Sequence, residues 1–183
     1  MVLITEYLLA RTRAEAVAAS FSSIAARFDT PESVLSSGGD WEYATRSLGL
    51  RNRSKRFIET SREIVSRFDG CVPKEREDLL SLPGVGHYIA AAVRNFAWDI
   101  PEVLVDTNTI RIANRVSGRP VDKANHRNKL VVSHVSTLGS NRIGLTSRRN
   151  YALLDLAALV CTPTGRDCAS CPLRSTCSSA DKI

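Results

Sequence analysis

Helical periodicity is the feature that most constrains the fold of this 183-residue chain. Apolar residues recur at helical spacing along most of its length, as Val17, Phe21 and Ile24 do near the start. The one run typical of a strand, residues 103–105, is too short to found a sheet. The sequence therefore predicts an all-α protein built from many short helices.

Capping signals divide the periodic segments into separate helices. Thr30 followed by Pro31 is typical of an N-cap and a first helical residue, and Gly118 is typical of a helix end. Residues 73–77 combine a proline with two acidic residues, so they predict a further helix that begins at Pro73. Other helices are expected over segments 57–68, 89–97, 110–116 and 153–160.

Four of the five cysteines lie close together near the end of the sequence. Disulfides in so short a segment would imply export, and the N-terminal residues show neither a basic stretch nor a small-residue cleavage site. One metal centre is the alternative, either zinc or a [4Fe–4S] cluster, and the uneven spacing favours the cluster. The four expected ligands are Cys161, Cys168, Cys171 and Cys177. Cys71 stands apart, and we expect it to be an ordinary packed or half-exposed thiol.

The excess of positive charge indicates an anionic partner. Lysine and arginine number 25 against 19 acidic residues, which gives a net charge of +6. Nucleic acid, an anionic membrane surface or an acidic protein would each satisfy this charge. No apolar stretch approaches the ~20 residues that a membrane span needs. We therefore expect a soluble, cytoplasmic protein without a membrane partner.

The segment LPGVG at residues 82–86 lies between two predicted helices. Pro83 ends the first helix, while Gly84 and Gly86 allow backbone conformations and close approaches that a Cβ would forbid. The free N–H groups of the helix that follows carry the positive end of its dipole. Such a turn predicts a seat for an anion such as a DNA phosphate.

Three motifs in order give the chain a recognisable pattern. LPGVGHYIAAAV, then VDTNTIRIANRV, then the cysteine array resemble the helix-hairpin-helix DNA glycosylases of the endonuclease III superfamily. The resemblance implies a six-helix barrel domain over residues 1–102 with the hairpin at 82–86. It also implies a smaller helical iron–sulfur domain over 103–183, with the cysteine loop at 161–177. The family normally has a further N-terminal helix before the point where this chain begins.

The resemblance also assigns roles to individual residues. Asp106 corresponds to the catalytic aspartate at the domain junction, and the same residue has the sequence of a helix N-cap. Tyr88 takes the place of the lysine that forms a Schiff base in strand-nicking members of the family. Glu6 corresponds to an acidic residue of the base pocket, with a surface glutamate as the alternative. The implied DNA contacts are Leu82, Gly84, Val85, Gly86, His87, Arg51, Arg53 and Lys55.

The implied function is base excision from DNA. A tyrosine at position 88 predicts a mainly monofunctional glycosylase, since a phenol cannot form an imine. The pair Arg11-Thr12 and the pattern of Asp106 and Asn108 favour removal of thymine or uracil opposite guanine. A MutY-like adenine glycosylase acting opposite guanine or 8-oxoguanine is the first alternative. A catalytically quiet lesion-binding module is the second, and an iron–sulfur electron carrier has no support beyond the cysteines. The expected partner is double-stranded DNA with a mismatched or damaged base, bound by a monomer.

Overall fold

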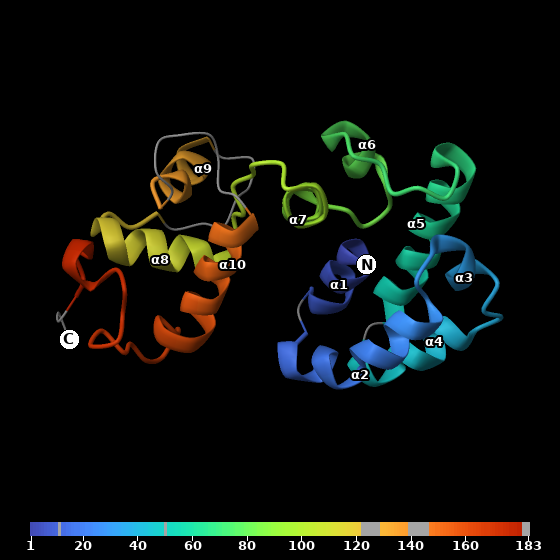
Figure 1. Ribbon diagram of the computed structural model, residues 1–183, viewed down its shortest axis with the longest axis horizontal. Helices are drawn as coiled ribbons and strands as arrows, with labels where there is room; N and C mark the ends of the chain where they lie inside the picture. The colour runs from blue at the N-terminus through green and yellow to red at the C-terminus, as the bar shows by residue number, and fades with distance from the viewer. Residues whose placement is uncertain (11, 50, 122–128, 139–146, 181–183) are drawn as a thin grey trace. The chain divides into compact units, whose positions relative to one another are not determined.

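The computed structural model describes residues 1–10, 12–49, 51–121, 129–138 and 147–180. The chain divides into two compact units, Met1–Trp98 and Asp99–Ile183. Every regular element in the described residues is helical, as the sequence predicted (Figure 1). Within these residues, no helix is both long enough and apolar enough to cross a membrane.

The first unit consists of short helices around one apolar core. Figure 1 shows α1 beside α7, with α3 and α4 against the long helix α5. The elements are α1 (Val2–Leu9), α2 (Ala14–Arg27), α3 (Pro31–Leu35), α4 (Asp40–Thr45), the short turn η1 (Arg46–Leu48), α5 (Arg51–Phe68), α6 (Arg76–Ser81) and α7 (His87–Trp98).

A chain of aromatic rings forms the centre of this core. Phe28 packs edge-on against Trp41 at 5.3 Å between ring centroids, and Trp41 contacts Phe57 at 4.8 Å. Phe57 in turn contacts Tyr7 of α1 at 4.8 Å. The Trp41 indole nitrogen donates to the Ser54 carbonyl at 3.1 Å, so the polar edge of this buried ring is also satisfied. These contacts fix α1, α2, α4 and α5 to one another.

Capping explains where most helices begin, with one difference from the sequence prediction. The Thr30 side chain accepts from the Ser33 backbone N–H at 3.2 Å, and Pro31 is the first residue of α3, as predicted. The helix predicted to begin at Pro73 begins instead at Arg76. Residues before it are extended, and the Lys74 carbonyl accepts from the Arg94 guanidinium at 2.7 Å rather than from a helical N–H.

The hairpin turn between α6 and α7 is held from inside the unit. The Pro83 carbonyl oxygen accepts hydrogen bonds from the hydroxyls of Tyr7 and Thr60, which lie 2.8 Å from each other. Gly84 follows with a φ of +77°, and a Cβ there would lie 2.7 Å from the Tyr7 hydroxyl oxygen. Glycine is therefore required at position 84 both by the backbone conformation and by Tyr7.

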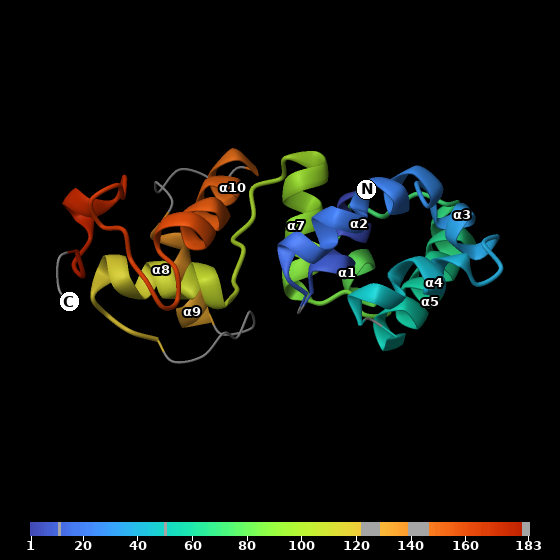
Figure 2. The same ribbon diagram turned by 90° about the horizontal axis from the view of Figure 1, so that it is seen from below.

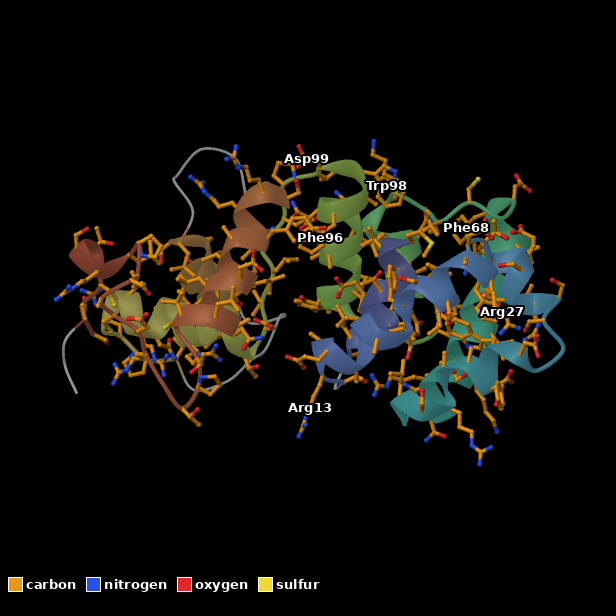
Figure 3. The ribbon with its side chains drawn as sticks, turned by 60° about the horizontal axis from the view of Figure 1, so that its bottom comes forward. Arg13, Arg27, Phe68, Phe96, Trp98 and Asp99 are labelled. Atoms are coloured by element: carbon orange, nitrogen blue, oxygen red, sulfur yellow. The ribbon has the colours of Figure 1, made fainter. Side chains whose placement is uncertain are left out.

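The second unit begins at Asp99, with residues 99–105 outside any helix, whereas the sequence predicted the boundary after Glu102. Figure 3 labels Trp98 and Asp99, the last residue of α7 and the first of this unit. The Ser147 hydroxyl donates to the Asp99 carboxylate at 2.7 Å, and this bond lowers the pKa of Asp99. The Asn150 amide donates to the Glu102 carbonyl at 3.1 Å. Both bonds tie the segment to the helix that starts at Ser147.

Two small apolar clusters complete the second unit. One joins Ile110 to Val131 and Val135, and the other joins Ile112 to Leu153. The first includes a helix that the sequence prediction missed. The elements are α8 (Thr107–Ser117), α9 (Lys129–Ser136), α10 (Ser147–Asp155), the wide turn η2 (Leu156–Val160) and the short turn η3 (Arg174–Thr176). The clusters lie where α8 contacts α9 and α10, the three helices that Figure 2 shows side by side.

The buried phenol of Tyr7 makes stability depend on pH in the alkaline range. Burial raises the pKa of Tyr7 from 10.0 to about 12. The unfolded chain therefore loses this proton at a lower pH than the folded protein, so stability falls between about pH 10 and about pH 12. Between about pH 9 and about pH 11, wild type should lose roughly 1 kcal/mol more than Tyr7→Phe, measured by urea unfolding. Equal losses in the two proteins would contradict this assignment.

Candidate functional site

Asp106 is fixed at the start of α8 by hydrogen bonds to its own helix. One carboxylate oxygen accepts from the Thr109 backbone N–H at 2.7 Å, and the Thr109 hydroxyl accepts from the Asp106 N–H at 3.0 Å. The other carboxylate oxygen accepts from the Asn108 amide at 2.9 Å. These bonds set the orientation of the carboxylate, and the residue as a whole is half-buried. The predicted capping role of Asp106 is therefore confirmed.

Further hydrogen bonds, made by Arg111, connect Asp106 through Asn108 to the C-terminal part of the unit. The Arg111 guanidinium donates to the Asn108 side-chain oxygen at 2.9 Å, which leaves the Asn108 amide facing Asp106. Arg111 also donates to the carbonyls of Ala157 and Cys161, each at 3.0 Å. Burial lowers the pKa of Arg111, and the nearby charge of Arg115 lowers it further. An arginine nevertheless stays protonated in proteins, so it keeps its positive charge here.

The four C-terminal cysteines line one small hollow that opens to solvent. Arg115 closes one side of it: its guanidinium donates to the Cys161 sulfur at 3.1 Å and to the Thr162 carbonyl at 2.8 Å. The Cys177 sulfur lies 3.3 Å from the Arg115 carbonyl oxygen. The thiolate is the form of cysteine that binds metal, and the Arg115 guanidinium would face the negative charge of such a ligand at Cys161.

Two kinds of metal site were expected for these cysteines, and they differ in how close the four sulfurs must lie. Among the residues that the structure describes, no three cysteine, histidine or acidic side chains lie close enough to share one ion. A tetrahedral zinc ion at about 2.3 Å from each sulfur would draw four thiolates together. An iron–sulfur cluster is bound at separate corners, so its ligands can line a wider hollow. Cys71 is exposed and lies in the other unit.

The hairpin residues combine buried anchors with an accessible backbone. Leu82 and Val85 are buried, whereas Gly84 and Gly86 are exposed and His87 is half-buried. The Gly86 carbonyl accepts from the Ala90 N–H at 2.9 Å, so Gly86 caps α7. A Cβ at Gly86 would meet no atom within 4 Å, so the fold itself does not require a glycine there. The absence of acidic residues from the first turn of α7 leaves its positive end uncompensated.

Glu6 and Tyr88 belong to the first unit, and Asp106 belongs to the second. Glu6 is 8% exposed in α1, which excludes the alternative of a surface glutamate. Tyr88 is half-buried in the first turn of α7, next to the hairpin. Both residues thus have surroundings compatible with the pocket roles that the sequence predicted, and those roles remain predictions.

The predicted basic DNA contacts differ in accessibility. Lys55 is exposed on α5, whereas Arg53 is half-buried and one of its terminal guanidinium nitrogens is buried. The Arg51 side chain lies outside the described residues, as do Arg11 and the 122–128 segment.

Sequence reasoning missed the structural roles of Arg111 and Arg115. Their spacing of four, on the helix that Asp106 caps, was the available signal.

The chain is similar to known proteins over most of its length. It is 34% identical over 179 residues to the thymine-DNA glycosylase of Aeropyrum pernix, covering 96% of this chain and 80% of that protein. No protein-family model matches the chain.

Solved structures give the same result. The structure of a thermostable thymine-DNA glycosylase superposes with a TM-score of 0.86 at 28% identity, covering 100% of this chain and 84% of that one. A non-covalent endonuclease III–DNA complex gives 0.83 at 24% identity, covering 99% and 83%, which shows a shared fold. The chain therefore belongs to the helix-hairpin-helix DNA glycosylases of the endonuclease III superfamily.

Proposed function

We propose that the protein is a mainly monofunctional base-excision glycosylase that removes thymine or uracil opposite guanine from double-stranded DNA. The observation that carries this proposal is the half-buried Asp106 carboxylate, held by the Thr109 N–H and the Asn108 amide. The similarity to the thymine-DNA glycosylase of Aeropyrum pernix supports the choice of base. The protein acts as a monomer.

The chemistry assigned to Asp106 follows from the bond that must break. A base stacked in a duplex is out of reach, so its nucleotide has to be extruded first. Cleavage of the bond between the base and C1′ leaves positive charge on the sugar, which a fixed carboxylate beneath it stabilises. A water oxygen then bonds to C1′, and Asp106 takes the proton that this water loses. The products are the free base and an abasic site.

Glu6 and Tyr88 supply the surroundings of the extruded base in this proposal. Glu6 lies at low exposure on α1 and can hydrogen-bond an edge of the base. The Tyr88 phenol offers a hydrogen bond and a ring face, and it has no amine for covalent attack on C1′. Water is therefore the nucleophile, and the strand stays intact.

The hairpin and the exposed cations bind the DNA backbone. The N–H groups at the start of α7, after Gly84 and Gly86, face a phosphate that the helix dipole attracts. The buried Leu82 and Val85 anchor the turn in the core, and their predicted contacts with DNA stay predictions. Lys55 adds an exposed charge on α5. Arg53 makes a smaller contribution because part of its guanidinium is buried.

Four thiolate donors, with an arginine beside them, are a donor set that suits a [4Fe–4S] cluster. Cys161, Cys168, Cys171 and Cys177 would bind it, and the Arg115 guanidinium would offset the negative charge of the sulfurs. When bound, it cross-links the C-terminal loop and takes no part in hydrolysis. Because Arg111 joins this loop to Asn108, the loop also supports the orientation of Asp106.

Substitution of Asp106 by asparagine separates catalysis from folding. Asparagine is as good an N-cap as aspartate, so α8 and DNA binding should be preserved. Base release from T·G and U·G duplexes should fall roughly a hundred- to ten-thousandfold, measured as alkali-labile sites. Asp99→Asn changes a second aspartate that accepts from a helix start, and it should keep wild-type activity. Equal base release by Asp106→Asn and wild type would overturn the proposal. Preference of wild type for A·G or A·8-oxoguanine duplexes would show that the excised base is adenine.

Position 88 should decide whether the DNA strand is nicked. Wild type should leave abasic sites that break only in alkali, and borohydride should trap almost no covalent complex. Tyr88→Lys places an amine at the same half-buried position, so it should produce trapped complex on the same duplex. Efficient trapping by wild type would contradict a monofunctional mechanism.

Metal analysis should identify the centre. Purified protein should carry about four irons and four sulfides per chain, with the brown absorbance of a cluster. Cys168→Ser should lose the iron, whereas Cys71→Ser should retain it, because Cys71 lies in the first unit. One zinc per chain, with no iron, would refute the cluster.

A further inference from the structure

A second hollow lies in the first unit, and of its lining residues the proposed function uses only Lys55. Its volume is about 400 Å³, which is within the range of small-ligand sites. Its walls come from α4, η1 and the first turns of α5, and they include none of Glu6, Tyr88 and Asp106. The described residues that line it are Glu42, Tyr43, Thr45, Arg46, Asn52, Ser54 and Lys55.

The floor of this hollow is rigid. Thr45 and Ser54 are buried, and the Thr45 hydroxyl donates to the Ser54 hydroxyl at 3.0 Å. The same Thr45 hydroxyl lies 2.8 Å from the Trp41 carbonyl. Trp41 in turn belongs to the aromatic core and is 1% exposed. The hollow therefore keeps its shape without a ligand, which lowers the cost of binding one.

Tyr43 presents an aromatic ring to this hollow and to solvent. Its side chain is 76% exposed, although Trp41 in the same short helix is almost fully buried. A large ring at this exposure contributes little to folding. It does offer a flat face against which another planar group can stack, and every nucleobase has such a face.

The charged residues near the Tyr43 ring indicate which second group the ligand would carry besides a planar one. Arg46 and Lys55 are both exposed and both line the hollow, against the one carboxylate of Glu42. The first turn of α5 carries no acidic residue. A phosphate would bind the two cations, whereas the Glu42 carboxylate and the Asn52 amide suit the N–H groups and oxygens of a base edge. A ligand that carries both a planar base and a phosphate is a nucleotide.

We propose that the hollow bounded by Tyr43, Arg46 and Lys55 binds one unstacked nucleotide of a DNA strand. A base inside a duplex has both faces covered by its neighbours, so Tyr43 can stack only on a base that has left the helix. The site is separate from the residues assigned to excision. This proposal rests on the proposed function, because it takes DNA as the ligand. It gives the enzyme a second contact that prefers locally opened DNA to a regular duplex.

Binding without excision tests this site. The probe is a fluorescein-labelled oligothymidylate of about eight nucleotides, titrated with full-length protein while anisotropy is followed. Tyr43→Ala should weaken binding of this strand roughly five- to a hundredfold, and Tyr43→Phe should restore most of it because the ring is kept. Lys55→Ala should lower the slope of log K against log salt by about 0.7. A fully paired duplex should lose much less affinity when Tyr43 is truncated.

Matched controls separate the hollow from general surface effects. Tyr151→Ala removes another exposed tyrosine, 51% exposed in the second unit, and should leave strand binding unchanged. Arg62→Ala removes an exposed cation of α5 that does not line the hollow, and should change affinity less than Lys55→Ala. Unchanged strand binding by Tyr43→Ala would overturn the proposal. If thymidine 5′-monophosphate displaces the labelled strand at a concentration equal to that of the strand, the ligand is a free nucleotide, and the assignment to a DNA strand is wrong. Base release is not measured here, so failure of the excision chemistry would show only in the Asp106→Asn comparison.

Discussion

The orientation of one carboxylate, that of Asp106, depends on most of the second unit. Its two oxygens accept from the Thr109 N–H and the Asn108 amide, and the Asn108 side chain is itself held by Arg111. Arg111 reaches the carbonyls of Ala157 and Cys161, which belong to the turn that leads into the cysteine loop. A continuous path of hydrogen bonds between charged or polar groups, which are directional, therefore joins the loop to the carboxylate.

The first unit fixes its own functional backbone in a comparable way. The Pro83 carbonyl sits at the end of the aromatic core, where the hydroxyls of Tyr7 and Thr60 both reach it. These hydroxyls are the polar ends of buried side chains, so losing either partner would leave an unsatisfied group in the core. The hairpin keeps its shape because the core beneath it is packed, and Gly86 remains open on the outside.

Local signals made much of the fold predictable. The caps at Thr30 and Asp106 and the end at Gly118 act within four residues, so their sequences carry the full information. The prediction that α6 begins at Pro73 was wrong. The Lys74 carbonyl is bound by Arg94, and no local pattern reveals a contact across twenty positions. For the site, the motifs identified Asp106 and the cysteines, whereas the Tyr7–Pro83 and Arg111–Cys161 bonds join residues far apart in sequence.

These contacts also change how the net positive charge is interpreted. The excess of basic residues indicated an anionic partner, but several arginines bind this protein's own carbonyls instead. Arg111 and Arg115 do so around the cysteine loop, and the guanidinium of Arg53 is partly buried. Arginine suits this use because its donors are spread over a planar group that can satisfy several carbonyls at once. The charge available to DNA is therefore better judged from exposed side chains such as Lys55 than from composition.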